Sequence, residues 1–272
     1  MAKQAQTQYG ISEQRSAVDR IDVHVQEIQI AGFTVVESGF TRMQLSDWRD
    51  RVDSLLERQT AEGGGRSELA QIQEADVVRC PLAYDESFLA VATNEVVIEI
   101  CRRLVGDYHV LMQQNAVVNP ANQGHHQRAY HRDLPYQHWV SSRPLSVSAL
   151  LCLDAFSRET GGTCVVPGTH KIEYFPSDEC AQRLERTVEA DAGCFLVFDS
   201  MLYHRAGSNS SPHPRRAINN VYTIPLIKQQ ISLPAALNGK WSDDPKLSRL
   251  LGYESESARS VEEFRSRRRS RR

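Results

Sequence analysis

The sequence predicts a mainly β protein with flanking helices, built as one structural domain of 272 residues. Its hydrophobic fraction of 40% is enough to bury one large core. Amphipathic helical patterns fill most of the chain before residue 108, and short β-rich runs divided by Gly, Pro and Asn follow. Repeated short strands at this spacing are typical of a sandwich or closed barrel rather than of alternating β-α units.

Three helices and one short strand are expected in the first part of the chain. The first helix covers residues 12–31, where apolar side chains recur at three- and four-residue spacing: Val18, Ile21, Val25 and Ile28. The strand follows at residues 32–38. A second helix is expected at residues 45–62, ended by the Gly-rich "EGGGR", and a third within residues 85–106, ended by a glycine.

Five β-rich runs make up the second part. They are "YHVLMQQNAVVN" at 108–119, "LSVSALLCLD" at 145–154, "TCVVPG" at 163–168, "CFLVFD" at 194–199 and "AINNVYTIPLI" at 217–227. No internal repeat is evident among them. These runs predict the strands of the sandwich or barrel.

The expected organisation is a helical part at residues 1–107 that packs on a β core at residues 108–232. A C-terminal segment at residues 233–264 should include one short helix. The tail at residues 265–272, "RSRRRSRR", should be disordered, because a short Arg/Ser terminus cannot bury apolar surface.

Charge and composition narrow the class of protein. The net charge is −2, but the tail holds six arginines, so the rest of the chain has eight more acidic than basic side chains. A nucleic-acid contact of the tail is the minor alternative to a solvated end. No stretch approaches the roughly 20 apolar residues of a membrane span, and the N-terminus lacks a signal-like apolar block. Six cysteines occur without a C-x-x-C pair and are expected to be reduced, in a cytoplasmic protein.

A histidine and an aspartate lie two residues apart in "AYHRDLPYQHW", residues 129–139. In a strand, His131 and Asp133 would project to one face and Arg132 to the other. One imidazole and one carboxylate are two ligands of the facial triad that binds non-haem Fe(II), and the third must be another histidine. His204, directly after an apolar strand, is the best candidate. A hydrogen-bonded polar surface pair is the alternative for an H-x-D taken alone.

Three segments in a fixed order resemble the phytanoyl-CoA dioxygenase family of Fe(II)- and 2-oxoglutarate-dependent oxygenases. They are "YHRDLPY" at 130–136, "GGTCVVPGTHK" at 161–171 and "HRAGSNSSPHPRRAI" at 204–218. The resemblance implies a double-stranded β-helix core, also called a jelly-roll or cupin-like core. It also implies Fe(II), 2-oxoglutarate and O2 as cofactor and co-substrates, with release of succinate and CO2. The expected reaction is hydroxylation or desaturation of a small organic substrate.

The same resemblance assigns roles to individual residues. It makes His131, Asp133 and His204 the iron ligands, and Arg215 the partner of the distal carboxylate of 2-oxoglutarate. A guanidinium offers a planar fork that matches a carboxylate. Alternation alone says only that Arg215 and Arg216 face opposite ways; the family spacing favours Arg215. Because relatives that halogenate have a small residue in place of Asp133, halogenation is not expected.

Other co-substrate contacts are less well defined by the sequence. Gln113, seven residues before Pro120, matches a glutamine that often helps to hold 2-oxoglutarate in the family. Gln114 is the alternative, and a purely structural amide is a further interpretation of either residue. Ser146 and Ser148 share one face of their strand and are ranked below Gln113 as co-substrate contacts.

Substrate should enter over the mouth of the barrel. The candidate substrate-binding residues are Arg128, Tyr130 and Trp139, and Trp139 is equally well explained as a lid or core anchor. A cationic and aromatic rim suggests an anionic or sugar-like small molecule, although fold does not fix substrate. The alternative function is a non-catalytic or isomerase-type cupin-like metal-binding protein, which would not need Arg215.

Overall fold

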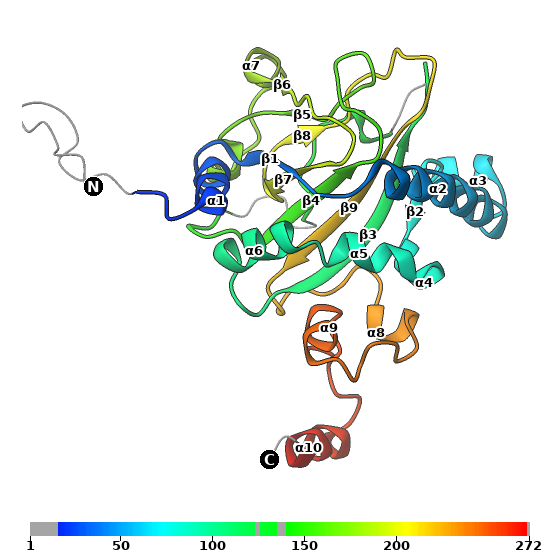
Figure 1. Cartoon of the computed structure of the whole chain (residues 1–272), viewed down its shortest axis with the longest axis vertical. Helices are drawn as coiled ribbons and strands as arrows, with labels where there is room; N and C mark the ends of the chain where they lie inside the picture. The colour runs from blue at the N-terminus through cyan, green and yellow to red at the C-terminus, as the bar shows by residue number, and fades with distance from the viewer. Residues whose placement is uncertain (1–15, 123–125, 135–139, 271–272) are drawn as a thin grey trace, which may run out of the picture.

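The computed structural model describes residues 16–122, 126–134 and 140–270. In Figure 1 a twisted sheet forms the centre of the molecule, with α5 and α6 crossing one face of it and α2 at one side. A smaller sheet lies above it, and the C-terminal helices lie below it. The mainly β architecture with flanking helices is therefore confirmed.

The first helix ends where expected but begins later, because residues 16–19, predicted to be helical, lie before its first residue; residues 12–15 lie outside the described chain. Helix α1 spans Arg20–Ala31, and its N-cap Asp19 accepts a hydrogen bond from the Asp22 backbone N–H. The helix ends at Gly32, whose φ of 95° suits glycine and whose missing Cβ leaves room for Leu202. Strand β1, Phe33–Glu37, follows as expected. Helix α2 spans Arg42–Glu62 and begins with a capping box between Thr41 and Gln44.

The prediction of a single helix within residues 85–106 is wrong. The structure instead has a 3-10 turn η1 at Glu86–Phe88, then α5 at Leu89–Ala92 and α6 at Glu95–Leu104. Asn94 causes the break, because its side chain caps α6 at the Val97 N–H and also donates to the Ser38 carbonyl. Three further elements lie in the preceding stretch, which carried no expectation: α3 (Arg66–Gln71), β2 (Val77–Arg79) and α4 (Pro81–Tyr84).

The long strands lie at the expected apolar runs and form one antiparallel sheet. They are β3 (Val110–Asn119), β4 (Ser146–Cys152), β7 (Cys194–Asp199) and β9 (Arg215–Thr223). With β1 and β2 at its edges, the sheet has the order β1-β7-β4-β9-β3-β2. A second, three-stranded sheet has the order β6-β5-β8, from strands at Arg186–Thr187, Cys164–Val165 and His204–Arg205.

The two faces of the large sheet are buried differently. The outer face packs against the helices, so that Val97 and Ile100 of α6 share one core with Leu151, Ile218 and Tyr222 of the sheet. The inner face packs toward the small sheet through a second core: Leu150, Cys152, Phe156, Val165, Val188, Leu196, Phe198, Leu202 and Ala217. Each buried Val, Leu or Phe side chain of this core contributes about 1.5–3 kcal/mol relative to exposure. The space between the two sheets, the interior of the jelly roll, is where a site can form.

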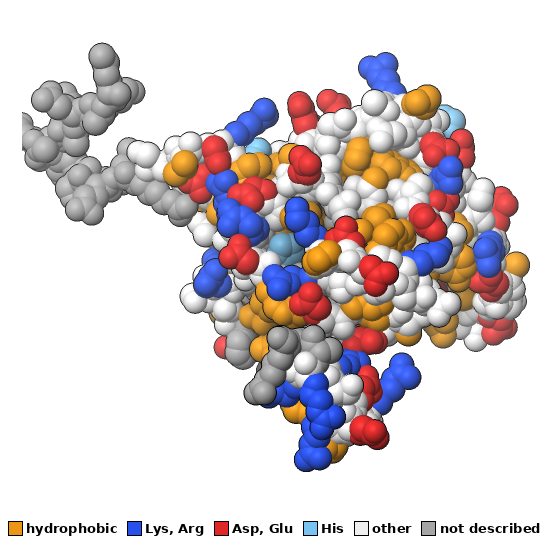
Figure 2. Space-filling model, turned by 60° about the horizontal axis from the view of Figure 1, so that its bottom comes forward, with side chains coloured by type: hydrophobic (Ala, Val, Ile, Leu, Met, Phe, Trp, Pro, Cys, Tyr) orange, Lys and Arg blue, Asp and Glu red, His pale blue; other side chains and the backbone are white. Residues whose placement is uncertain are grey.

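The C-terminal part is more helical than expected. It contains α8 (Leu233–Ala236), α9 (Pro245–Leu250) and α10 (Val261–Ser270). The expected disorder of the tail is wrong for residues 265–270, which belong to α10. An ion pair between Arg267 and Glu263 at i,i+4 spacing, and a bond from Arg267 to the Glu256 carbonyl, support this helix. Figure 2 shows basic side chains gathered at this end of the molecule.

The remaining short elements connect the strands. They are η2 (His126–Arg128), η3 (Thr169–Lys171) and α7 (Asp178–Leu184). Among the helices within the described ranges, none has both the length and the apolar character of a membrane span.

Candidate metal centre

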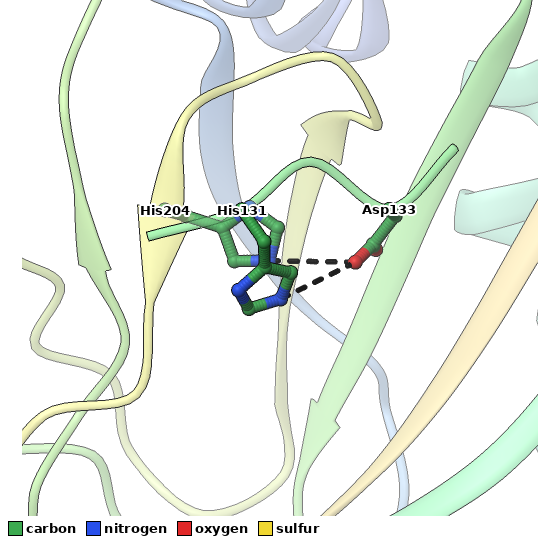
Figure 3. Close-up of side chains that lie close together, drawn as sticks. All are labelled: His131, Asp133 and His204. Carbon is green, nitrogen blue, oxygen red and sulfur yellow. Dashed lines mark ion pairs between the residues drawn. The ribbon is translucent and has the colours of Figure 1, made fainter. Parts of the chain in front are cut away.

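Two histidines and one carboxylate meet in the interior of the jelly roll (Figure 3). One ligand atom from each of His131, Asp133 and His204 lies within 4.8 Å of the others. The Nε2 atoms of His131 and His204 lie 3.9 and 3.4 Å from Oδ1 of Asp133. Two imidazole nitrogens and one carboxylate oxygen on one side of an ion are the donor set of the facial triad. The three residues therefore fit a divalent metal ion.

The local structure that brings these residues together is not the strand that was expected. His131 forms only an isolated bridge to His204, with backbone N–H to carbonyl distances of 2.9 and 3.1 Å. The Asp133 N–H then donates to the Ser200 carbonyl at 2.9 Å. These backbone bonds fasten the loop to the segment that carries His204. His131 and Asp133 do lie on one side, as predicted, but the cause is this loop and not alternation along a strand.

Backbone carbonyls determine which ring nitrogen of each histidine carries the proton. Nδ1 of His131 lies 3.0 Å from the Ala129 carbonyl, and Nδ1 of His204 lies 2.9 Å from the Leu202 carbonyl. A carbonyl oxygen only accepts hydrogen bonds, so each Nδ1 must carry the proton. Both Nε2 atoms point toward Asp133, and in the neutral rings they hold the lone pair that a metal requires.

The charges of the donor residues support one another. Burial by itself raises the pKa of Asp133, but His204, His131 and the hydrogen bond from Ser148 together outweigh burial and hold the pKa well below its usual range. Burial lowers the pKa of His204, and Asp133 more than compensates, so that this pKa lies above its usual value. Asp133 is therefore ionised at neutral pH, which is the state that binds a metal.

Arg132 lies between the two first donors but takes no part in the group. Its side chain is buried and donates to the carbonyls of Thr169 and Ile172 at 3.1 and 2.7 Å. Its guanidinium also lies 4.8 Å from the centre of the Phe175 ring. Arg132 therefore anchors the donor loop to the segment around η3, on the side away from the donors.

Arg215 lines the same cavity as the three donors. It is only 3% exposed, and its guanidinium lies 4.3 Å from the centre of the Phe156 ring. Within the described part of the chain, its Nε has no hydrogen-bond acceptor. Burial lowers the pKa of Arg215 to about 10. A buried cation that forms no ion pair with the described residues fits a ligand that brings a carboxylate.

Arg216 has the opposite environment, as alternation along β9 requires. Its guanidinium forms two bonds of 2.7 Å to the Asp53 carboxylate and one of 3.2 Å to Asp154. These acidic groups raise the pKa of Arg216. Of the two arginines, only Arg215 faces the cavity.

The glutamine candidates do not line the cavity, and Ser148 contacts a metal donor. Gln113 lies beside a β-bulge, opposite Val221, and is not in the lining of the cavity. Gln114 is buried among the helices, where its amide donates to the Phe88 carbonyl and to Asn220, so it is structural. Ser148 does face inward, but its hydroxyl donates to Asp133 rather than pointing at open space.

The two described candidate substrate residues, Arg128 and Tyr130, contact other parts of the protein. Arg128 is exposed and donates to the Ser208 hydroxyl. Tyr130 donates to Glu185 and stacks on Tyr203 with ring centres 4.8 Å apart. Trp139 lies outside the described residues. The cavity lining includes neither Arg128 nor Tyr130, so their part in substrate binding stays a prediction.

Several cavity residues were not singled out from the sequence. They are Val117, Gln127, Leu150, Thr163, Phe198, Arg205, Ala206 and Asn219. Asn219 lies four residues after Arg215 on β9, so the period of two could have indicated it. Arg205 is neutralised by Glu185 at 2.6 and 2.7 Å. No sequence signal connects these two residues, because Glu185 reaches Arg205 only through the fold.

A jelly roll with a His-Asp-His donor group and a buried arginine in one cavity defines a class of non-haem metalloproteins. Residues 28–217 match the phytanoyl-CoA dioxygenase (PhyH) family. The chain belongs to this family. It is also 30% identical to the Mycobacterium tuberculosis protein Rv1501 over 259 residues, and this aligned region covers 93% of each chain. "Dioxygenase af480" of Aspergillus fumigatus is 31% identical over 168 residues, 58% of this chain and 52% of that protein.

Solved structures share the fold. Iron-bound HygX from Streptomyces hygroscopicus superimposes with a TM-score of 0.60 at 18% identity, over 82% of this chain and 95% of that chain. The epimerase SnoN, in complex with Fe3+, alpha ketoglutarate and nogalamycin RO, gives a TM-score of 0.59 at 17% identity, over 75% and 84%. At this level of identity the likeness establishes the cupin-like core and its helical additions.

Proposed function

We propose that the protein is an Fe(II)- and 2-oxoglutarate-dependent dioxygenase that hydroxylates or desaturates a small organic substrate and releases succinate and CO2. The observation that carries the proposal is the buried Arg215, without an acceptor for its Nε in the described chain, in the cavity of the metal donors. Family membership supports the same class of activity.

Each residue of the site then has a role. His131 and His204 would bind iron through Nε2, and Asp133 through a carboxylate oxygen. Arg215 would hold the distal carboxylate of 2-oxoglutarate in a charge-assisted fork. The bound iron and 2-oxoglutarate supply the oxidising chemistry, while the protein orients the reactants. Val117, Leu150 and Phe198 line the cavity with apolar groups that limit the entry of water.

The site argues against one alternative function and leaves a second to the product analysis below. A non-catalytic or isomerase-type cupin-like protein has no need for an unpaired buried arginine beside the metal. The epimerase named among the structural neighbours uses iron and alpha ketoglutarate, so a change of stereochemistry is a further outcome for this scaffold. The substrate is proposed to be an anionic or sugar-like small molecule, and HygX was crystallised with hygromycin B bound.

Spectroscopy tests the donor group and the co-substrate together. Anaerobic addition of Fe(II) and 2-oxoglutarate should give a weak visible charge-transfer band, and His131→Ala and Asp133→Ala should lose it. His213→Ala, which removes an exposed histidine outside the cavity lining, is the matched control and should keep the band. A normal band in both donor variants would refute the site.

A turnover assay then identifies the reaction. Substrate-dependent succinate formation is measured against acyl-CoAs, nucleotide sugars, amino acids and hygromycin B, and mass spectrometry of the product separates the outcomes. Hydroxylation adds one oxygen atom and raises the mass of the product by about 16 Da. Desaturation removes two hydrogen atoms and lowers the mass by about 2 Da. Stereochemical inversion leaves the mass unchanged. The proposed function would be refuted if no compound of the panel increased succinate formation and the wild-type protein also lacked the charge-transfer band.

A further inference from the structure

Three buried serine hydroxyls form a continuous chain behind the metal donors. Ser146 and Ser148 lie on the inner face of β4, and Ser200 directly follows β7. The Ser200 hydroxyl lies 2.8 Å from the hydroxyls of both Ser146 and Ser148. The Ser148 hydroxyl donates to Oδ2 of Asp133 at 2.5 Å. The three serines are 1%, 0% and 0% exposed in the order Ser146, Ser148, Ser200.

Proton counting gives this chain a single direction. Each serine hydroxyl has one proton to donate. The Ser148 proton is used on Asp133, so the bond between Ser148 and Ser200 must have Ser200 as its donor. The Ser200 proton is then used as well, and Ser146 must donate to Ser200. All three O–H dipoles therefore point toward the Asp133 carboxylate, and aligned bonds in a dry interior strengthen one another.

The two oxygens of Asp133 have different surroundings as a result. Oδ2 accepts from Ser148 and, at 3.4 Å, from the side-chain amide of Asn219. Oδ1 instead faces Nε2 of both histidines. Only Oδ1 is directed at the position that the three donors share.

We propose that Ser146, Ser200 and Ser148 act as positioning residues that occupy Oδ2 and leave Oδ1 as the one oxygen with which Asp133 binds the metal. The inference rests on the metal centre of the proposed function and deepens it. Six-coordinate iron with three protein donors keeps three positions for its co-substrates. A carboxylate that bound through both oxygens would remove one of these positions, and the serine chain prevents that.

Binding of Co(II) alone to the full-length protein, measured by titration calorimetry and visible absorption, tests the proposal. Ser148→Ala should weaken Co(II) binding about 10–100-fold, the usual effect of removing a partner of a metal ligand. It should also change the Co(II) absorption spectrum, because the freed Oδ2 can enter the coordination sphere. Ser146→Ala, which touches no metal donor, should weaken binding a few-fold through the shared chain.

The matched control removes a buried hydroxyl that lies outside the chain. Thr223 on β9 is fully buried and donates to the Leu145 carbonyl at 2.9 Å. Thr223→Val should leave both the Co(II) affinity and the spectrum as in wild type. A general loosening of the core would instead affect this variant as much as Ser148→Ala.

The outcomes separate the two levels of the proposal. Wild type that binds no Co(II) would overturn the metal centre itself. Wild-type affinity and spectrum in Ser148→Ala would overturn the serine chain and leave the metal centre in place. Where Ser148→Ala does not fold, Ser146→Ala decides in its stead: a weaker affinity supports the chain, and an unchanged affinity overturns it.

Discussion

Arg215 and Arg216 are neighbours in the chain, yet the two faces of β9 give them opposite electrostatic surroundings. On the outer face, Arg216 is bound by the carboxylates of Asp53 and Asp154. On the inner face, Arg215 is more deeply buried and its Nε has no acceptor in the described chain. The outer arginine is paired within the protein, and the inner one is, in the proposed function, the partner of a ligand carboxylate.

The difference has an energetic meaning. Acidic partners raise the pKa of Arg216, so folding favours its charged form. Burial lowers the pKa of Arg215 to about 10, so folding disfavours its charged form. A buried unpaired charge destabilises the free protein, and a carboxylate that binds there relieves the destabilisation. In the proposed function the site is thus preorganised for an anion and lowers the stability of the free protein, as functional sites commonly do.

The largest effect is expected when each arginine is removed and the need for 2-oxoglutarate is measured. Arg215→Ala should raise the 2-oxoglutarate concentration for half-maximal rate about 100-fold, because truncating one partner of a buried charged bond costs about 2–5 kcal/mol. Arg216→Ala should leave that concentration unchanged and lower the melting temperature. Equal effects on the co-substrate requirement would contradict the assignment of the two faces.

Replacement by methionine should then reverse the ranking of the two residues for stability. Arg215→Met removes an unpaired buried charge, and the free energy of unfolding without 2-oxoglutarate should rise by roughly 1–3 kcal/mol. Arg216→Met breaks two ion pairs, so the same quantity should fall. Urea denaturation of both variants measures the changes. A loss of stability in Arg215→Met would show that the inner guanidinium is satisfied by the protein itself.

The sequence predicted which residues form the candidate site better than it predicted their contacts. The motif around His131 and the order of His204 and Arg215 were sufficient to propose the site, but the strand assumed for His131 and Asp133 does not exist. Family spacing favoured Arg215 over Arg216, and the fold adds that Arg215 lines the cavity whereas Arg216 is paired with acidic side chains. The contacts of both arginines depend on residues that are far apart in the chain.

The misses have the same physical origin. Ser146 and Ser148 were expected to share one face of their strand, but the partners of Ser148, Asp133 and Ser200, lie 15 and 52 residues away, where no local pattern reaches. The helix expected within residues 85–106 failed because Asn94 competes for backbone partners across the fold. Local periodicity therefore predicts the face on which a side chain lies, and long-range packing determines what it binds.

A buried carboxyl group extends the comparison to an acid without an ion pair. Asp199 ends β7, accepts a bond from the Met201 N–H, and has no ion pair within the described residues. Burial raises its pKa from 3.8 to about 6. Between these values the folded state binds a proton that the unfolded state releases, so the free energy of unfolding falls as the pH rises through about 4 to 6.

Asp199→Asn should remove that fall. The variant should be more stable than wild type at pH 7.5, by up to about 3 kcal/mol for a shift of about two pKa units, and nearly equal to it at pH 4. Urea denaturation across the pH range gives both numbers. Asp154→Asn is the matched control, because Asp154 is paired with Arg49 and Arg216 and its loss should destabilise at pH 7.5. A variant at Asp199 that is less stable than wild type at pH 7.5 would contradict the sign.

The smallest effect is expected at the C-terminal end. This end is exposed and basic, whereas the cavity is buried. Figure 1 shows α10 below α8 and α9, at the far end of the molecule from the small sheet that carries His204. Deletion of residues 265–272 removes the bond from Arg267 to the Glu256 carbonyl and leaves the cavity lining intact. Turnover should stay within about two-fold of wild type and the free energy of unfolding within about 0.5 kcal/mol, as for other surface changes. A loss of turnover with unchanged stability would instead assign the arginine tail a part in the reaction or in delivery of an anionic substrate.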